Sequence, residues 1–485
     1  MSDPAPISAP TLMSAPTLMN ALALMSAEDL LEAYARTALS PVEVLQATTE
    51  RIARLNPTIN AFAVMNPEAL AQAGASAARW RAGRPIGPLD GVPVTIKDLV
   101  DVAGLPTRRG SRLTDTAPAA EDAPLTMALR SAGAVILGKT TTTEFGWKSP
   151  GDCPLHGITR NPWNFHHTPG GSSSGAAAAA AAGFGPLHIG TDAGGSIRIP
   201  AAWCGVVGLK PSFGRVPQWP LGAFAAVAVA GPITRTVRDC ALMLNVLARH
   251  DLRDPYCLPD ERGYPGGRDW RDGIDHGIAG MKIAVLRRPG FDAPVDWEGI
   301  AAVEQAAQLM TDLGAEVEEA DAGLPDTRAI FSRVWGIALT RLVHAFPETR
   351  RHMLDPGLLE VAAANTGLSA EDFMAFEAAR IQAAHAMARF TQKYDLVLSP
   401  VVANPPPLAD APTQNPVEAL WTHWAPWTAA ANLTRQPAIS VPMGFAANGL
   451  PRSVQLAAAL YRDDLVLRGA RAIEMAQPFP MPDLG

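Results

Sequence analysis

The chain has 485 residues, 48% of them hydrophobic, with 40 Lys and Arg against 47 Asp and Glu. The resulting net charge of −7 argues against nucleic acid as a partner, because phosphate backbones are bound by surplus basic groups. No apolar stretch reaches the roughly 18 residues that a membrane-spanning helix needs, so we expect a soluble globular protein with a large core and no membrane partner.

The first 25 residues are expected to form a mobile tail. The sequence Ser-Ala-Pro-Thr-Leu-Met occurs at 8–13 and is repeated at 14–19. No Lys or Arg precedes Arg36, so this segment lacks the basic start of a signal peptide and indicates a cytoplasmic protein.

Two helices are predicted to follow within 26–65. Ser26 and Asp29 form a capping pattern at the start of the first helix. Ser40 caps the second helix, and Glu43 three residues later completes a capping box. These helices should pack one apolar face against the body of the protein.

A buried strand is predicted over Val92–Ile96, and it ends at Lys97. A lysine can act as a base only when it is neutral, and burial can lower its pKa from about 10.4 toward neutrality. Farther along, Gly133–Thr140 formally fits the pattern of a phosphate-binding loop. Its variable residues are Ala-Val-Ile-Leu, so we interpret it instead as a buried strand that follows a helix over 124–131.

Two blocks combine glycine with serine: Gly-Gly-Ser-Ser-Ser-Gly at 170–175 and Gly-Thr-Asp-Ala-Gly-Gly-Ser-Ile-Arg at 190–198. Glycine admits positive φ and leaves room for a ligand, so a neighbouring hydroxyl can be presented to a substrate. The first block also fits G-x-S-x-G, the nucleophile elbow of α/β-hydrolases, which would make Ser173 the nucleophile. That elbow follows a strand, whereas Asn-Phe-His-His-Thr-Pro at 164–169 is not strand-like.

The second half of the chain continues an α/β pattern. After a surface crossing at 251–280, a strand, a helix and a strand are predicted at 282–286, 299–313 and 315–319. Residues 325–393 are expected to be mainly helical, and closing strands are expected within 394–400 and 432–442.

The two glycine-serine blocks and the Lys97 segment resemble the amidase signature family, hydrolases that use two serines and a lysine. The resemblance implies Ser196 as nucleophile, Ser172 as a bridging serine preceded by a cis peptide bond, and Lys97 as base. The two serines lie 24 positions apart, which is the spacing of the family.

The resemblance covers about 26–456 and implies an α/β fold with one large domain over 26–485. A mixed twisted sheet would be covered by helices on both faces. Within the domain we expect the N-terminal helices at 26–65, the signature core at 91–247 and a variable, mainly helical substrate-pocket region at 325–420.

The implied reaction is amide hydrolysis through an acyl-enzyme, with no metal and no cofactor. The tetrahedral oxyanion would be held by the backbone N–H groups of Ala193, Gly194, Gly195 and Ser196. The supporting residues around them are Ser173, Thr191, Asp192 and Arg198.

The candidate substrate pocket contains Gly146 and Trp147, which precede the bridging serine, and Trp421, Trp424 and Trp427, which are spaced as one helical face. Such a stripe is more often core than pocket. A tryptophan-lined pocket would favour a small apolar or aromatic amide. Thr141 departs from the asparagine usual in the family, which leaves the loop geometry near the pocket open.

Four alternatives stay open at this point. Carbamates and aryl esters share the same acyl chemistry, so the same three residues could cleave either. The family also includes the A subunit of a glutamine-dependent amidotransferase, which works with partner subunits. A catalytically inert binding module is the last alternative, and the sequence is compatible with a homodimer.

Overall fold

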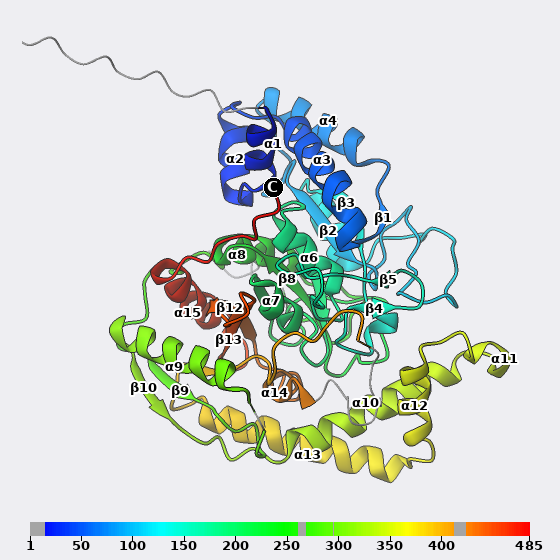
Figure 1. Ribbon diagram of the computed structural model, residues 1–485, viewed down its shortest axis with the longest axis vertical. Helices are drawn as coiled ribbons and strands as arrows, with labels where there is room; N and C mark the ends of the chain where they lie inside the picture. The colour runs from blue at the N-terminus through cyan, green and yellow to red at the C-terminus, as the bar shows by residue number, and fades with distance from the viewer. Residues whose placement is uncertain (1–14, 260–267, 294, 412–422) are drawn as a thin grey trace, which may run out of the picture.

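An eleven-stranded mixed sheet runs through the computed structural model of the protein, which describes residues 15–259, 268–293, 295–411 and 423–485 (Figure 1). The strand order is β1-β3-β2-β6-β8-β7-β12-β13-β11-β9-β10. The strands are β1 (Phe62–Met65), β2 (Pro93–Lys97), β3 (Val135–Thr140), β6 (Leu187–Asp192), β7 (Val207–Lys210), β8 (Val229–Thr234), β9 (Lys282–Val285), β10 (Glu316–Glu319), β11 (Leu396–Pro400), β12 (Ala438–Phe445) and β13 (Pro451–Ala457). A separate small hairpin joins β4 (Asp152–Cys153) to β5 (Gly157–Ile158).

The parallel pairing of β2 with β6 brings two predicted site segments together. Val94 lies opposite Leu187, and Ile96 lies opposite Ile189. Both strands therefore end at the same edge of the sheet, where Lys97 closes β2 and Asp192 closes β6. Because carboxyl ends of parallel strands meet at one edge, residues far apart in the sequence share a site there.

Helices cover both faces of the sheet, as the alternation of side chains along its strands requires. On β6, Leu187 and Ile189 pack into a core that also contains α5, α8, α9 and α15. Gly190 faces the other way, toward Ile197 and Ser173. The helices are α1 (Ala15–Ala23), α2 (Ala27–Ala35), α3 (Pro41–Ile59), α4 (Ala69–Arg81), α5 (Pro124–Ser131), α6 (Ser174–Ala182), α7 (Arg198–Cys204), α8 (Val237–Leu247), α9 (Trp297–Asp312), α10 (Thr327–His344), α11 (Glu348–Arg351), α12 (Pro356–Ala364), α13 (Ala370–Phe390), α14 (Pro426–Leu433) and α15 (Asp463–Ala476).

The N-terminal helices form as predicted. The Ser26 side chain accepts the Asp29 N–H, and both hydrogen bonds of the Ser40 capping box are present. The predicted mobile tail of 25 residues is too long, because Ala15–Ala23 forms α1 and packs on α3. Asn20 Oδ1 in α1 accepts a hydrogen bond from Arg51 at 3.0 Å, which anchors this segment. Residues 1–14 lie outside the described part of the chain.

The remaining elements also follow the sequence patterns. Residues 135–140 form strand β3, so the apparent phosphate-binding loop is a buried strand, as interpreted. The predicted strand, helix and strand are β9, α9 and β10. Helices α1 to α4 gather at one end of the molecule, while α9, α10, α12 and α13 lie at the other (Figure 1). None of the helices in the described part of the chain combines the length and the apolar character needed to cross a membrane.

Candidate active site

Lys97 is fully buried at the end of β2, and three hydroxyl groups surround its amine. Its Nζ lies 2.8 Å from Ser172 Oγ, 2.8 Å from Ser173 Oγ and 2.9 Å from Thr191 Oγ1. Burial lowers the pKa of Lys97 well below the usual value for a lysine, and the nearby Asp192 carboxylate opposes this only partly. The neutral amine, which can accept a proton, is therefore favoured at this position.

The neighbouring hydrogen bonds indicate which of the hydroxyls can give their protons to Lys97. A neutral amine has two N–H donors and one lone pair, so one of the three hydroxyls must donate to it. Ser173 Oγ lies 3.2 Å from the Thr191 carbonyl, to which it donates, and it accepts the Thr191 N–H at 3.2 Å. The proton of Ser173 therefore has another acceptor, whereas the hydroxyls of Ser172 and Thr191 can direct their protons to Nζ.

Ser172 and Ser196 line the same cleft. The peptide bond between Gly171 and Ser172 is cis, as the resemblance implied. The two glycine-serine blocks are also joined directly, because the Ser173 N–H donates to the Ser196 carbonyl at 3.2 Å. The structure thus brings together all three residues that the sequence pattern singled out.

A buried ion pair holds the loop that carries Ser196. Both carboxylate oxygens of Asp192 accept from Arg198, each at 3.0 Å, and they also accept the N–H groups of Gly195 and Ile197. Burial alone would raise the pKa of Asp192, but the charge and hydrogen bonds of Arg198 outweigh it and lower the pKa to about 2. Gly195 has φ 132°, and a Cβ there would collide with Thr428 Oγ1, so only glycine fits this turn.

The predicted oxyanion site needs one correction from this geometry. The Gly195 N–H donates to Asp192 Oδ1 at 2.7 Å, so it already has an acceptor within the loop. Gly195 thus shapes the turn, and it is not a donor to the oxyanion in this arrangement. The N–H groups of Ala193, Gly194 and Ser196 stay in the prediction.

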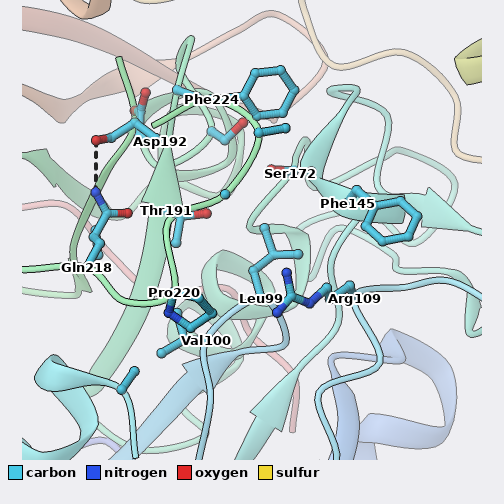
Figure 2. A pocket seen from close by; sticks show the side chains of 18 of the residues that line it. Leu99, Val100, Arg109, Phe145, Ser172, Thr191, Asp192, Gln218, Pro220 and Phe224 are labelled. Carbon is cyan, nitrogen blue, oxygen red and sulfur yellow. Dashed lines mark hydrogen bonds between the residues drawn. The ribbon is translucent and has the colours of Figure 1, made fainter. Parts of the chain in front are cut away.

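The cleft above the serines has a volume of about 130 Å³ and opens to solvent. Its walls combine apolar and polar side chains, many of them from loops that follow β2, β3 and β7 (Figure 2). The apolar side chains include Leu99, Val100, Phe145, Pro220, Phe224 and Leu342. Phe224 is fixed by a stacked contact with Trp335, with ring centroids 3.8 Å apart and an interplanar angle of 9°.

Comparison with known proteins agrees with this geometry. The family model described as Amidase matches residues 43–467. The chain belongs to the amidase family. A curated acylamidase of Rhodococcus erythropolis is 38% identical over 93% of this chain and 95% of its own length. The A subunit of the glutamyl-tRNA(Gln) amidotransferase of Methylococcus capsulatus is 33% identical over 92% of this chain and 96% of its own.

Solved structures place the fold in the same group. A bacterial aryl acylamidase of the amidase signature family has a TM-score of 0.86 and 32% sequence identity, covering 94% of this chain and 97% of that one. Together these relatives confirm the predicted fold class and the predicted activity: the protein is an enzyme that hydrolyses amide bonds.

The tryptophans predicted to line the substrate pocket of the amidase do not line the cleft. Trp427 is buried and donates to the Leu286 carbonyl at 3.2 Å, and Trp424 packs against Trp203. Trp147 is also buried in the apolar cluster around α10, α12 and α14. Trp421 lies outside the described residues. Of the predicted pocket residues that are described, Gly146 alone is in the cleft wall, where a Cβ would approach Ser172 Oγ to 3.1 Å.

Sequence reasoning missed most of the true cleft wall of the amidase. Leu99, Phe224, Gln218 and Arg109 were not singled out, although all four line the cleft. The expected pocket region at 325–420 contributes Leu342 to it. One usable signal was the turn-rich segment 217–224, in which Trp, Pro, Gly and Phe stand together between two strands. Aromatic residues in a loop of this kind are more exposed than those on a periodic helix face.

Proposed function

We propose that this amidase cleaves a small apolar or aromatic acyl amide through an acyl-enzyme on Ser196, with Ser172 and Lys97 moving the proton. The observation that carries this proposal is the 2.8 Å contact between the buried Lys97 amine and the Ser172 hydroxyl, at the floor of a cleft that Ser196 also lines. A serine hydroxyl is a weak nucleophile until a base takes its proton, and a desolvated lysine can be that base.

The proton would travel in two directions during one turnover. Neutral Lys97 accepts the Ser172 proton while Ser172 accepts that of Ser196, whose oxygen then attacks the amide carbon. Collapse of the tetrahedral intermediate breaks the C–N bond, and Ser172 returns a proton to the leaving nitrogen. A water molecule then releases the acyl group by the same route. The N–H groups of Ala193, Gly194 and Ser196 would hold the oxyanion, and losing one such donor costs about 10²- to 10³-fold in rate.

The walls of the cleft support an apolar substrate. Leu99, Phe145 and Phe224 offer flat or branched apolar surface near the serines, and apolar pockets with a few polar groups suit small organic ligands. The relatives at 38% and 32% identity are an acylamidase and an aryl acylamidase, which also favours an anilide. Carbamates and aryl esters use the same chemistry and belong in the same assay.

The experiment is a panel of anilides, aliphatic amides, carbamates and aryl esters, assayed with wild type, Lys97→Ala and Ser196→Ala. We expect anilides to give the highest kcat/KM and both variants to lose activity. A fluorophosphonate should label the wild type but not Ser196→Ala. Amide turnover that survives Lys97→Ala unchanged would show that the proposed base is wrong.

One relative supports a second candidate function, that of the glutamine-hydrolysing component of an amidotransferase. Such a component would hydrolyse glutamine and would purify together with partner subunits. Glutaminase activity that exceeds anilide activity, with co-purified partners, would favour this candidate over the acylamidase. Turnover of anilides by the isolated chain would favour the acylamidase.

A further inference from the structure

Arg109 places a positive charge in the cleft wall. Its half-buried side chain is among those that line the cleft (Figure 2). Among the described residues, no carboxylate lies within 4.0 Å of its guanidinium, and no hydrogen-bond acceptor is within reach. Fully buried charges in folded proteins are normally paired, whereas this half-buried guanidinium keeps its hydrogen-bonding groups available to a ligand that enters the cleft.

The backbone of Arg109 is held in place without help from its side chain. Its N–H donates to the Asp98 carbonyl at 3.1 Å, and its own carbonyl accepts the Phe145 N–H at 2.8 Å. Arg109 and Phe145 both have left-handed backbone, with φ values of 52° and 51°. Few residues other than glycine adopt this conformation, and those that do gather at functional sites. The guanidinium therefore has no structural role in the described contacts.

The carboxylates nearest to this position favour binding on the cleft side of Arg109. A second hollow, outside the cleft, is lined by Arg109 together with Asp101, Asp115 and Glu121. An anion in that hollow would be repelled by three carboxylates. The cleft side carries apolar groups, the candidate catalytic hydroxyls and one carboxylate, Asp192, which is already paired with Arg198. A bound anion would therefore meet Arg109 there with less opposing charge.

We propose that Arg109 binds a carboxylate on the amine portion of the amide substrate. The inference rests on the proposed function and narrows its substrate to an acylated aromatic amine that carries an acid group. Ser172, the proposed proton donor to the leaving nitrogen, adjoins Gly146, and Phe145 of the same turn is hydrogen-bonded to Arg109. The amine would therefore lie on this side, with its ring near Phe145. A planar guanidinium matches a carboxylate with two parallel hydrogen bonds.

The test compares one acidic and one neutral anilide in full-length enzyme. The substrates are para-acetamidobenzoate, para-methylacetanilide and, with the acid on the acyl side, N-phenylsuccinamate. The variants are Arg109→Gln, Arg109→Lys and, as a matched control, Arg108→Gln. Arg108 is the preceding arginine, is not in the cleft lining, and donates to Thr114 Oγ1 at 3.3 Å.

We expect Arg109→Gln to lower kcat/KM on para-acetamidobenzoate by about 10- to 100-fold, mainly through KM, because one charged hydrogen-bonding group is lost. Turnover of para-methylacetanilide should change less than about 3-fold in the same variant. Arg109→Lys should recover part of the loss because it keeps the charge, and Arg108→Gln should resemble wild type.

Three results would overturn the inference: equal loss on the acidic and neutral anilides, no loss on either, or a loss confined to N-phenylsuccinamate. The inference would also be overturned if the wild-type enzyme hydrolysed para-methylacetanilide but not para-acetamidobenzoate. If wild type hydrolyses none of the anilides, the proposed function itself is wrong. The two failures are therefore distinguishable.

Discussion

Ser172 and Ser173 are adjacent hydroxyls at the same 2.8 Å distance from Lys97 Nζ, yet alanine at the two positions should have different consequences. Ser172 lines the cleft, and its proton is available to Lys97. Ser173 is fully buried and exchanges two hydrogen bonds with the Thr191 backbone. The first hydroxyl is placed to move a proton, and the second is placed to hold the strand end.

The size of each effect follows from these contacts. Ser172→Ala removes the proton relay, and general acid–base catalysis of this kind is worth about 10²- to 10⁴-fold in rate. That loss corresponds to about 3 to 5 kcal/mol of barrier. Ser173→Ala leaves the partly buried Thr191 N–H without this acceptor, which costs about 1 kcal/mol of unfolding free energy. We expect its kcat to fall by less than about 10-fold.

The assay pairs kcat/KM on a neutral anilide with urea denaturation of each variant. Ser172→Ala should lose activity with little loss of stability, and Ser173→Ala should show the reverse. Equal or greater loss of activity in Ser173→Ala, with stability unchanged, would refute this reasoning. That outcome would instead favour Ser173 as the nucleophile, as the G-x-S-x-G pattern suggested.

Three further expectations concern pH, the Asp192 ion pair and the cleft wall. Because burial lowers the pKa of Lys97, kcat/KM on a neutral anilide should rise with pH through one ionisation below that of an ordinary lysine, and a pH–rate profile that falls there would contradict a neutral base. Asp192→Asn should cost about 3 to 5 kcal/mol in urea denaturation because it breaks a buried pair, whereas Glu32→Gln in an exposed pair should cost less than about 1 kcal/mol. The Asp192 contribution is present above the ordinary pKa of 3.8 and should be lost as pH falls toward about 2. Phe224→Ala should raise KM for anilides, whereas Trp427→Phe should lower stability and leave KM unchanged. A raised KM in Trp427→Phe with no change in Phe224→Ala would instead indicate that the tryptophan lines the pocket.

The sequence alone was sufficient to single out Lys97, Ser172 and Ser196, which the structure brings to one site, because their signals are local. A side chain at position 195 would collide with Thr428 Oγ1, so this position must be glycine. The serines lie at fixed offsets from glycines of this kind, so the pattern can be recognised from a few consecutive residues. Lys97 was recognisable because it ends an apolar strand. The capping residues Ser26 and Ser40 were predictable for the same reason, since a cap and its partner are only three residues apart.

The cleft wall could not be predicted because it is assembled over long distances. Leu99, Phe145 and Phe224 come from three loops that meet only after the sheet has formed. The spacing of Trp424 and Trp427 predicted one apolar helix face, but Trp424 precedes α14, and a core and a pocket would impose the same spacing. The contact of Trp424 with Trp203 and that of Trp427 with the Leu286 carbonyl show that both belong to the core. These partners are more than 100 residues away in the sequence.

The position of Arg198 links the activity to the order in which the chain is made. Its guanidinium binds Asp192 but also reaches Gln455 Oε1 at 2.6 Å, Asn432 Oδ1 at 2.6 Å and the Thr428 carbonyl at 3.0 Å. The loop that carries Ser196 is therefore also held by groups synthesised more than 200 residues after it. A ribosome-bound chain that ends before Thr428 carries Lys97, Ser172, Ser196 and the Asp192–Arg198 pair but lacks all three distant contacts of the Arg198 guanidinium. Hydrolytic activity should consequently appear only when synthesis is nearly finished.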